Sequence, residues 1–330
     1  MLFAATLSLQ LAACQSEPHR IPYIPATLAN WSQPYRGVDG MRVHVLNTGY
    51  LRITEALLIH GGSLQRTRTV PVPVMVIEHP RNGLVLVSTG LSPQPRAGAE
   101  PAFESLSSIL FSTTAVRGQP LKAQMQAAGI KPDKVRWIIL PTLRFYHTGN
   151  LVGFPEARVI VSKSEIEHAR SPSTNYNQSE FAAVANWKYI DFEVAKPLAT
   201  FPAAVDLFGD GSFMLLNSAG VTPGGVAVLV RLSERPLLVA GDLAPLADTL
   251  RYTAEPAQVE DFDQWWMNIW RLKRFSDLVP DLLVAPAFDV SALRGANVAS
   301  ITVAAFDKPP EKATASPTPD HLRRMLPAPM

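Results

Sequence analysis

The chain has 330 residues, of which 47% are hydrophobic and 18% are charged, so it can bury a sizeable core and is not a disordered protein. Its formal net charge is +2, with acidic and basic residues interspersed, which argues against a nucleic-acid-binding surface and against a nucleic-acid partner. A single cysteine excludes a disulfide framework.

The N-terminal residues have the pattern of a bacterial lipoprotein signal. Residues 2–13 are almost all apolar or small, and they lead directly to Cys14, which is the only cysteine of the chain. We therefore expect residues 1–13 to be a signal peptide that is removed, and Cys14 to carry the lipid that anchors the protein to a membrane. The apolar run is too short to span a bilayer. Gln15, rather than Asp, follows the cysteine, and by resemblance to Gram-negative lipoproteins this predicts a cell-envelope protein on the outer membrane, facing the periplasm.

The first half of the chain is predicted to form strands interrupted by two helices. Residues 41–49 alternate between apolar and polar side chains, as in a strand, and residues 72–87 read as a hairpin that turns at 81–83. A helix is predicted over 121–128, where Gly129 ends it. A buried strand over 135–140, a second strand ending at Val161, and a helix over 164–170 with a serine N-cap follow.

The second half repeats the alternation of strands and helices. Strands are predicted over 213–216, 226–230 and 236–240, followed by a long helix over 259–278 and a last apolar run at 281–286. Hairpins followed by strand–helix units, twice over, favour two sheets packed between helix layers, that is, an α/β fold of the αββα sandwich type. One domain is expected over 30–306, between a tether of residues 14–29 and a Pro-rich mobile tail over 307–330.

The segment after the strand at 135–140 resembles a known metal-binding loop. It reads Thr142-Leu143-Arg144-Phe145-Tyr146-His147, in the place where the metallo-β-lactamase superfamily carries His-x-His-x-Asp-His. Of these four ligand positions, only the last is kept, as His147. The resemblance extends over roughly residues 41–289 and is to the N-acyl-homoserine-lactonase-like branch of the superfamily, which implies the αββα fold of that family.

The remaining ligand positions can be assigned from the same resemblance. Residues 218–225 stand where the family has Thr-Pro-Gly-His, and the histidine is replaced by Val221. Residues 238–242 match the strand that delivers the bridging aspartate, which is kept as Asp242, whereas the last histidine is replaced by Phe288. The Asp of the branch's Val-Asp-Thr-Gly segment is Ser88 here. Two of seven metal positions therefore match, His147 and Asp242, although the glycines, prolines and strands around them are retained.

This ligand set argues against zinc hydrolysis, and we expect no cofactor. A catalytic zinc ion takes three protein ligands and an open position for water, and the resemblance implies only two ligands. Arg144 places a permanent cation where a ligand should lie, and a guanidinium cannot deprotonate to coordinate a metal.

Three interpretations of the resulting cleft remain open. Arg144 can form an ion pair with Asp242 that simply fills the site, with His147 and Tyr146 nearby. Alternatively, Arg144, Tyr146 and Thr142 can bind the carboxylate or carbonyl group of a small ligand. The third interpretation is a rebuilt, weakly held metal ion, zinc or iron, with Tyr146, His147 and Asp242 as its ligands.

Two functional classes follow from these interpretations. The first is a catalytically degenerate, membrane-tethered protein that binds a small anionic or lactone-like ligand or acts as an envelope scaffold. The second is a metallo-hydrolase of the lactonase-like branch that retains activity through an unusual site, in which His147 and Asp242 would be the catalytic residues. The sequence names no protein partner.

Overall fold

The computed structural model describes residues 19–93, 113–171, 176 and 178–306. The predicted signal peptide, the lipidation residue Cys14 and the predicted tail over 307–330 lie outside the described residues. None of the helices in the described part of the chain is long and apolar enough to cross a bilayer.

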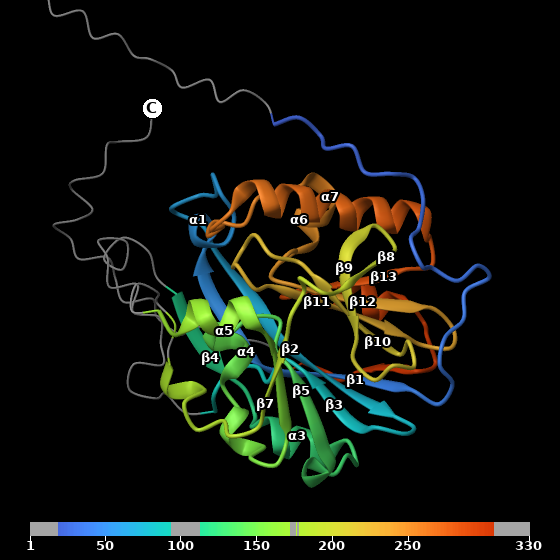
Figure 1. The fold of residues 1–330 in the computed structure, drawn as a ribbon. Coiled ribbons are helices and arrows are strands. Elements are labelled where there is room, and N and C mark those ends of the chain that lie inside the picture. Colours follow the sequence, from blue (N-terminus) through green and yellow to red (C-terminus); the bar gives the residue numbers. More distant parts are fainter. Residues whose placement is uncertain (1–18, 94–112, 172–175, 177, 307–330) are drawn as a thin grey trace, which may run out of the picture.

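Two β-sheets form the centre of the molecule (Figure 1). The first has the strand order β14-β1-β2-β3-β5-β6-β7, with β4 paired to β1; its strands are β1 (Arg42–Thr54), β2 (Thr67–His79), β3 (Gly83–Val87), β4 (Thr113–Arg117), β5 (Val135–Ile139), β6 (Arg158–Ser162), β7 (Trp187–Ile190) and β14 (Ile301–Val303). The second has the order β13-β12-β11-β10-β9-β8; its strands are β8 (Lys196–Leu198), β9 (Phe201–Asp206), β10 (Phe213–Asn217), β11 (Val226–Arg231), β12 (Pro236–Gly241) and β13 (Leu283–Pro286).

Helices cover the outer face of each sheet, so the predicted αββα sandwich is confirmed (Figure 1). The helices on the side of the first sheet include α3 (Leu121–Ala127), α4 (Phe145–Thr148) and α5 (Lys163–Ala169), whereas α6 (Ala247–Tyr252) and α7 (Phe262–Leu278) lie over the second. The short helices α1 (Glu55–Leu58) and α8 (Ser291–Gly295) follow β1 and β13.

The alternation of side chains along the strands builds three apolar layers. In β2, Met75 and Ile77 point into the core between the two sheets, whereas Val74 and Val76 point towards α3 and α5. A third layer forms where Trp265 and the other inward residues of α7 pack on the second sheet. Successive residues of one strand therefore stabilise different layers, which is why both faces of the first sheet are apolar.

Most predicted elements agree with the structure to within a few residues, and two differences have clear causes. The N-cap of α5 is Ser162, whose side chain accepts a hydrogen bond from the Glu165 N–H, so the helix begins earlier than predicted. The apolar run at β13 does not end the fold, because α8 follows it and β14 pairs with β1 in parallel. Three-residue strands such as β14 carry too little pattern to be recognised in a sequence.

One buried histidine, His79, links the two sheets. His79 is buried at the end of β2, where its Nε2 lies 3.0 Å from Ser212 Oγ and 3.3 Å from Asp210 Oδ2. Its Nδ1 accepts hydrogen bonds from the backbone N–H groups of Arg81 and Asn82. The imidazole thus joins the β2–β3 turn of one sheet to the β9–β10 turn of the other.

Candidate functional site

Strands from both sheets end at one edge of the sandwich, and the site lies there. The loop after β5 leads into α4, Asp242 follows β12, and Ser88 follows β3; β3 is parallel to β5, and β12 is parallel to β13. The structure brings together the residues at all of the positions assigned from the resemblance, Val221 through its backbone carbonyl: Thr142, Arg144, Tyr146, His147, Val221, Asp242, Phe288 and Ser88.

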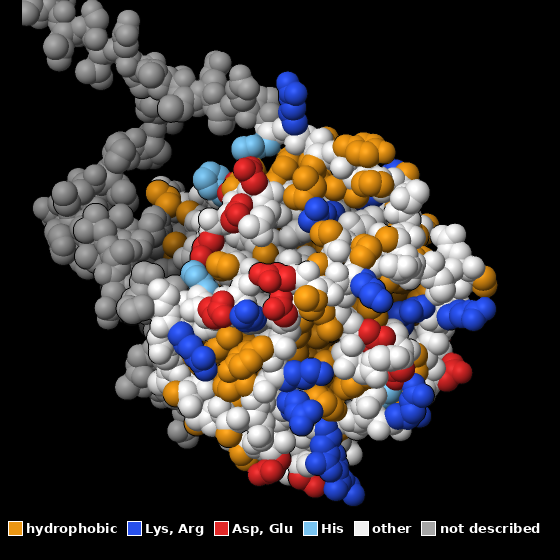
Figure 2. Space-filling view, in the orientation of Figure 1, with side chains coloured by type: hydrophobic (Ala, Val, Ile, Leu, Met, Phe, Trp, Pro, Cys, Tyr) orange, Lys and Arg blue, Asp and Glu red, His pale blue; other side chains and the backbone are white. Residues whose placement is uncertain are grey.

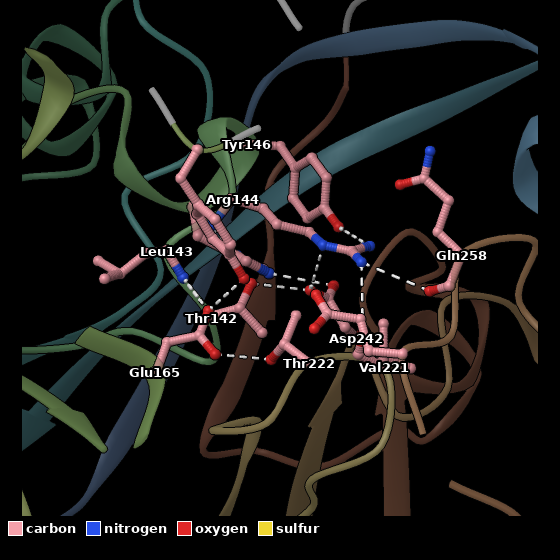
Figure 3. Close-up of polar contacts among 12 residues, drawn as sticks. Thr142, Leu143, Arg144, Tyr146, Glu165, Val221, Thr222, Asp242 and Gln258 are labelled. Carbon is pink, nitrogen blue, oxygen red and sulfur yellow. Dashed lines mark hydrogen bonds and ion pairs between the residues drawn. The ribbon is translucent and has the colours of Figure 1, made fainter. Parts of the chain in front are cut away.

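Asp242 is the buried anion at the centre of this cluster (Figure 3). Its Oδ2 accepts a hydrogen bond of 2.8 Å from the Thr142 hydroxyl, and its Oδ1 lies 3.3 Å from His147 Nε2. Burial alone would raise the pKa of Asp242, but the neighbouring His147, Arg144 and Thr142 outweigh that effect and lower it to about 2. The carboxylate is therefore ionised at any physiological pH.

The position of Asp242 also determines which nitrogen of His147 carries a proton. A bare Nε2 lone pair facing an ionised carboxylate at 3.3 Å would be repelled, so Nε2 must be protonated and donate to Asp242. On the other side of the ring, Nδ1 lies 2.9 Å from Ser88 Oγ, which already accepts from the Gly90 N–H at 3.1 Å. The Ser88 hydroxyl can donate to Nδ1, since its other acceptor, the Tyr146 carbonyl, is 3.5 Å away. In this arrangement Nε2 of His147 donates to Asp242, and Nδ1 accepts from Ser88.

Ser88 occupies a backbone conformation that suits a different residue. Its φ is +69°, in the left-handed region that Asn and Asp adopt several times more readily than other non-glycine residues. The backbone at Ser88 therefore has a conformation that would suit the aspartate of the related family, but the side chain there is a shorter, neutral hydroxyl.

Arg144 reaches from the loop after β5 to two backbone carbonyl groups in the second half of the chain (Figure 3). Its Nη1 donates to the Tyr146 hydroxyl at 3.2 Å, and its Nε lies 4.0 Å from Asp242 Oδ2. Its Nη2 lies 3.5 Å from the Val221 carbonyl oxygen and 3.4 Å from that of Gln258. These contacts are long for a guanidinium, which normally makes charge-assisted bonds of about 2.7–2.9 Å. The Arg144 side chain remains 22% exposed, so solvent reaches the cation.

Aromatic side chains form the wall beside Arg144. The ring of Tyr146 packs edge to face on His147 and on Phe288, with centroid distances of 4.7 and 5.0 Å. Burial raises the pKa of Tyr146 well above its usual value, so the phenol stays neutral. Tyr146 is therefore a hydrogen-bond donor and acceptor rather than a phenolate ligand.

A buried carboxyl group that sequence reasoning did not identify supports the loop from below. Glu165 of α5 accepts hydrogen bonds from the Leu143 N–H at 2.8 Å, the Tyr176 hydroxyl at 2.8 Å and the Thr222 hydroxyl at 2.6 Å (Figure 3). Burial raises the pKa of Glu165, and these three donors oppose the increase. In the sequence it reads only as an acid in the first turn of a helix, since no local pattern places it under the loop at Leu143.

The residues present do not fit a zinc centre. Within the described ranges, no group of three or more His, Cys, Asp or Glu side chains is arranged to hold a metal ion. The iron site considered above would use Tyr146, His147 and Asp242 as ligands; here the Tyr146 hydroxyl accepts a hydrogen bond from Arg144 Nη1, and His147 Nε2 faces Asp242 Oδ1 at 3.3 Å. Arg144, with its fixed positive charge, lies among the remaining groups instead.

The structure places Asp242 near Arg144, but not as its closest partner. The shortest polar contact of the guanidinium is with Tyr146, and Asp242 receives its hydrogen bonds from Thr142 and His147. Arg144 and Asp242 therefore interact mainly through charge.

Comparisons with protein families, curated proteins and solved structures all point to the same superfamily. A model of the metallo-beta-lactamase superfamily matches residues 67–287. Among curated proteins, the chain is 25% identical over 222 residues to the N-acyl homoserine lactonase AttM of Azorhizobium caulinodans, covering 66% of this chain and 81% of that protein. It is 23% identical over 243 residues to AttM of Rhizobium radiobacter, covering 72% and 89%. Among solved structures, a B. thuringiensis AiiA mutant with N-decanoyl-L-homoserine bound at its active site superposes with a TM-score of 0.62 at 17% identity, covering 77% of this chain and 95% of that one.

Proposed function

The chain belongs to the metallo-beta-lactamase superfamily, and we propose that it is a non-hydrolytic member that binds a small anionic or lactone-like ligand through Arg144 while tethered to the cell envelope. The observation that carries the proposal is the guanidinium of Arg144 among the positions where the family holds its metal. It supplies one fixed positive charge, 4.0 Å from Asp242, and it cannot activate a water molecule as a metal ion does.

The contacts of Arg144 favour a ligand-binding site over a site that is filled by an ion pair between Arg144 and Asp242. Its two backbone partners are 3.4 and 3.5 Å away, so they satisfy the guanidinium poorly. A carboxylate can pair with both Nη atoms at shorter distances, because the planar fork matches its two oxygens. The neutral Tyr146 hydroxyl, 3.2 Å from Nη1, is placed to bond the same ligand, and the Thr142 hydroxyl is held by Asp242.

The names of the relatives indicate which ligand to test. The AttM proteins are N-acyl homoserine lactonases, and the AiiA structure holds N-decanoyl-L-homoserine, which is a carboxylate. We therefore propose that the ligand is an N-acyl homoserine lactone or its ring-opened acid, with the acid binding more tightly because it carries the charge that Arg144 complements.

The anchor belongs to the same proposal. Lipidation of Cys14 would hold the domain at the outer membrane facing the periplasm, since acyl chains contribute about 0.8 kcal/mol per buried methylene. Mass spectrometry of the mature N-terminus tests this part independently, because an unprocessed Met1 or an unmodified Cys14 would remove it.

Isothermal titration with an N-acyl homoserine and the matching lactone tests binding. We expect the acid to bind the parent, and Arg144→Gln to weaken its binding by at least about tenfold, because the charged partner of the carboxylate is lost. Arg81→Gln serves as the matched control, since Arg81 pairs with Asp210 in the β9–β10 turn. Equal binding of the acid by the parent and by Arg144→Gln would refute the proposal.

The alternative, a metallo-hydrolase with an unusual site, is favoured by the lactonase relatives alone. It predicts lactone turnover that rises with added zinc or manganese and is abolished by His147→Ala and by Asp242→Ala. We expect no metal-dependent turnover above that of the buffer.

A further inference from the structure

The flank of helix α7 differs from its buried face. Trp265 points into the core below it, whereas three aromatic side chains spaced four residues apart are only partly buried: Phe262, Trp266 and Trp270. Lys273 continues the same row, with its Nζ 5.2 Å from the centre of the Trp270 ring. One side of the helix therefore presents a row of aromatic rings that ends in a cation.

The N-terminal segment of the described chain runs past α7 (Figure 1), and it contacts two rings of this row. The indole N–H of Trp266 donates to the Arg20 carbonyl oxygen at 2.9 Å, and the ring of His19 lies 4.2 Å from that of Phe262. Farther along this segment, Ile21 is 66% exposed and Tyr23 is 87% exposed. The segment that contacts α7 therefore also carries two largely exposed apolar side chains.

The end of α6 extends the surface. Lys273 donates to the Leu250 carbonyl at 2.7 Å, which joins α6 to α7, and beyond it Tyr252 is 68% exposed with the Arg251 guanidinium 5.8 Å from its ring centre. Figure 2 shows hydrophobic side chains, with Lys or Arg side chains among them, gathered at the top of the molecule, where Figure 1 places α7. We call this surface the aromatic roof and define it by these residues: His19, Arg20, Ile21, Tyr23, Arg251, Tyr252, Phe262, Trp266, Trp270 and Lys273.

We propose that the aromatic roof is the surface on which the domain docks to the membrane that holds its anchor. The proposal rests on the proposed lipidation of Cys14. Cys14 precedes His19 by five positions, so the chain length allows at most about 18 Å between the lipidated residue and the roof. Trp and Tyr side chains favour the boundary between lipid and water, and Arg and Lys favour anionic headgroups.

The charges around the roof indicate whether electrostatic attraction or insertion of apolar side chains contributes more to membrane binding. Helix α7 also carries Asp263 and Asp277, both exposed, which offset part of the positive charge of the roof. Insertion of the aromatic and apolar side chains therefore contributes more than net charge does, and binding should weaken only modestly in salt.

Docking on this surface would also bring the segment that contacts Arg144 towards the bilayer. Gln258, whose carbonyl oxygen lies 3.4 Å from Arg144 Nη2, precedes α7 by four residues.

Tryptophan quenching in vesicles tests the proposal. The full chain, purified from membranes and reconstituted into vesicles of phosphatidylethanolamine and phosphatidylglycerol with brominated acyl chains, should show quenched indole fluorescence. Most of the quenching should disappear in the Trp266→Phe/Trp270→Phe variant and persist in Trp187→Phe, because Trp187 lies on β7 of the other sheet. Unchanged quenching in the α7 variant, or loss of quenching in Trp187→Phe, would overturn the proposal.

A second pair of variants avoids the core of the protein. In an unlipidated mature chain that lacks residues 1–13 and carries Cys14→Ser, the roof variant Ile21→Asp/Tyr23→Asp should lower partitioning into the same vesicles by about tenfold or more, because two charges replace two inserted apolar side chains. The matched control is Val194→Asp, at a position 84% exposed between β7 and β8, which should leave partitioning unchanged. Equal partitioning of the roof variant and the control would refute docking by the roof, even where mass spectrometry shows that the native chain is lipidated. An unmodified Cys14 in the native chain would instead refute the anchor.

Discussion

The charge interaction between Arg144 and Asp242 yields a measurable coupling free energy. At 4.0 Å and an effective dielectric constant of about 20, the Coulomb attraction is about 4 kcal/mol. Two observations reduce this value: the Arg144 side chain is 22% exposed to screening solvent, and Asp242 receives its hydrogen bonds from Thr142 and His147 rather than from Arg144. We therefore expect a coupling of about 1–2 kcal/mol.

A double-mutant cycle measures this coupling directly. The variants Arg144→Met, Asp242→Asn and their combination are unfolded in urea, and the free energies of unfolding are obtained by linear extrapolation. The single changes should destabilise the protein, and the double change should cost about 1–2 kcal/mol less than their sum. As a control, Arg81→Met should combine additively with Asp242→Asn, because Arg81 pairs with Asp210 instead. A coupling within error of that control would refute the claim that Arg144 supplies the positive charge opposite Asp242.

Three further predictions follow from the same contacts. The free energy of unfolding should fall by about 2 kcal/mol as the pH drops from about 5 to 2, because the pKa of Asp242 is about 2 in the folded protein and has its ordinary, higher value in the unfolded chain. The Asp242→Asn variant should lose this part of the acid sensitivity. A pH profile of that variant identical to that of the parent would contradict the assignment. Nitrogen NMR should find the His147 proton on Nε2 in the parent chain, where the ring faces Asp242; a bare Nε2 would contradict the assigned tautomer. Gly224→Ala should destabilise the protein by several kcal/mol in thermal unfolding, because its Cβ would lie 2.2 Å from the Glu165 nitrogen; a Tm equal to that of the parent would show that the loop can move aside.

The fold could be predicted largely because its strands carry strong patterns. The hairpin of β2 and β3 combines apolar runs with an Asn-Gly turn, and the predicted strand at 135–140 corresponds to β5. Elements held only by their neighbours could not be recognised, such as β14, whose three residues are defined by pairing with β1. Short segments take their conformation from tertiary contacts rather than from local preference.

The composition of the site was predictable, but its internal contacts were not. Ordered motifs along the chain assigned Thr142, Arg144, His147 and Asp242 to one place, since each motif follows a strand at the same edge of the sandwich. The contribution of Glu165 depends on a side chain reaching across to the Leu143 amide, and no sequence pattern encodes that contact. Likewise, the burial of His79 depends on Ser212, 133 residues away.

The central claim is that a guanidinium has taken the place of a metal ion beside Asp242 and His147. The most direct test is an anomalous difference map from crystals of protein purified without chelator and soaked in zinc. We predict that the map shows no ordered metal within bonding distance of His147 Nε2 and Asp242 Oδ1, and that Arg144 remains beside Tyr146. A fully occupied metal between those two atoms, with Arg144 displaced, would contradict the account.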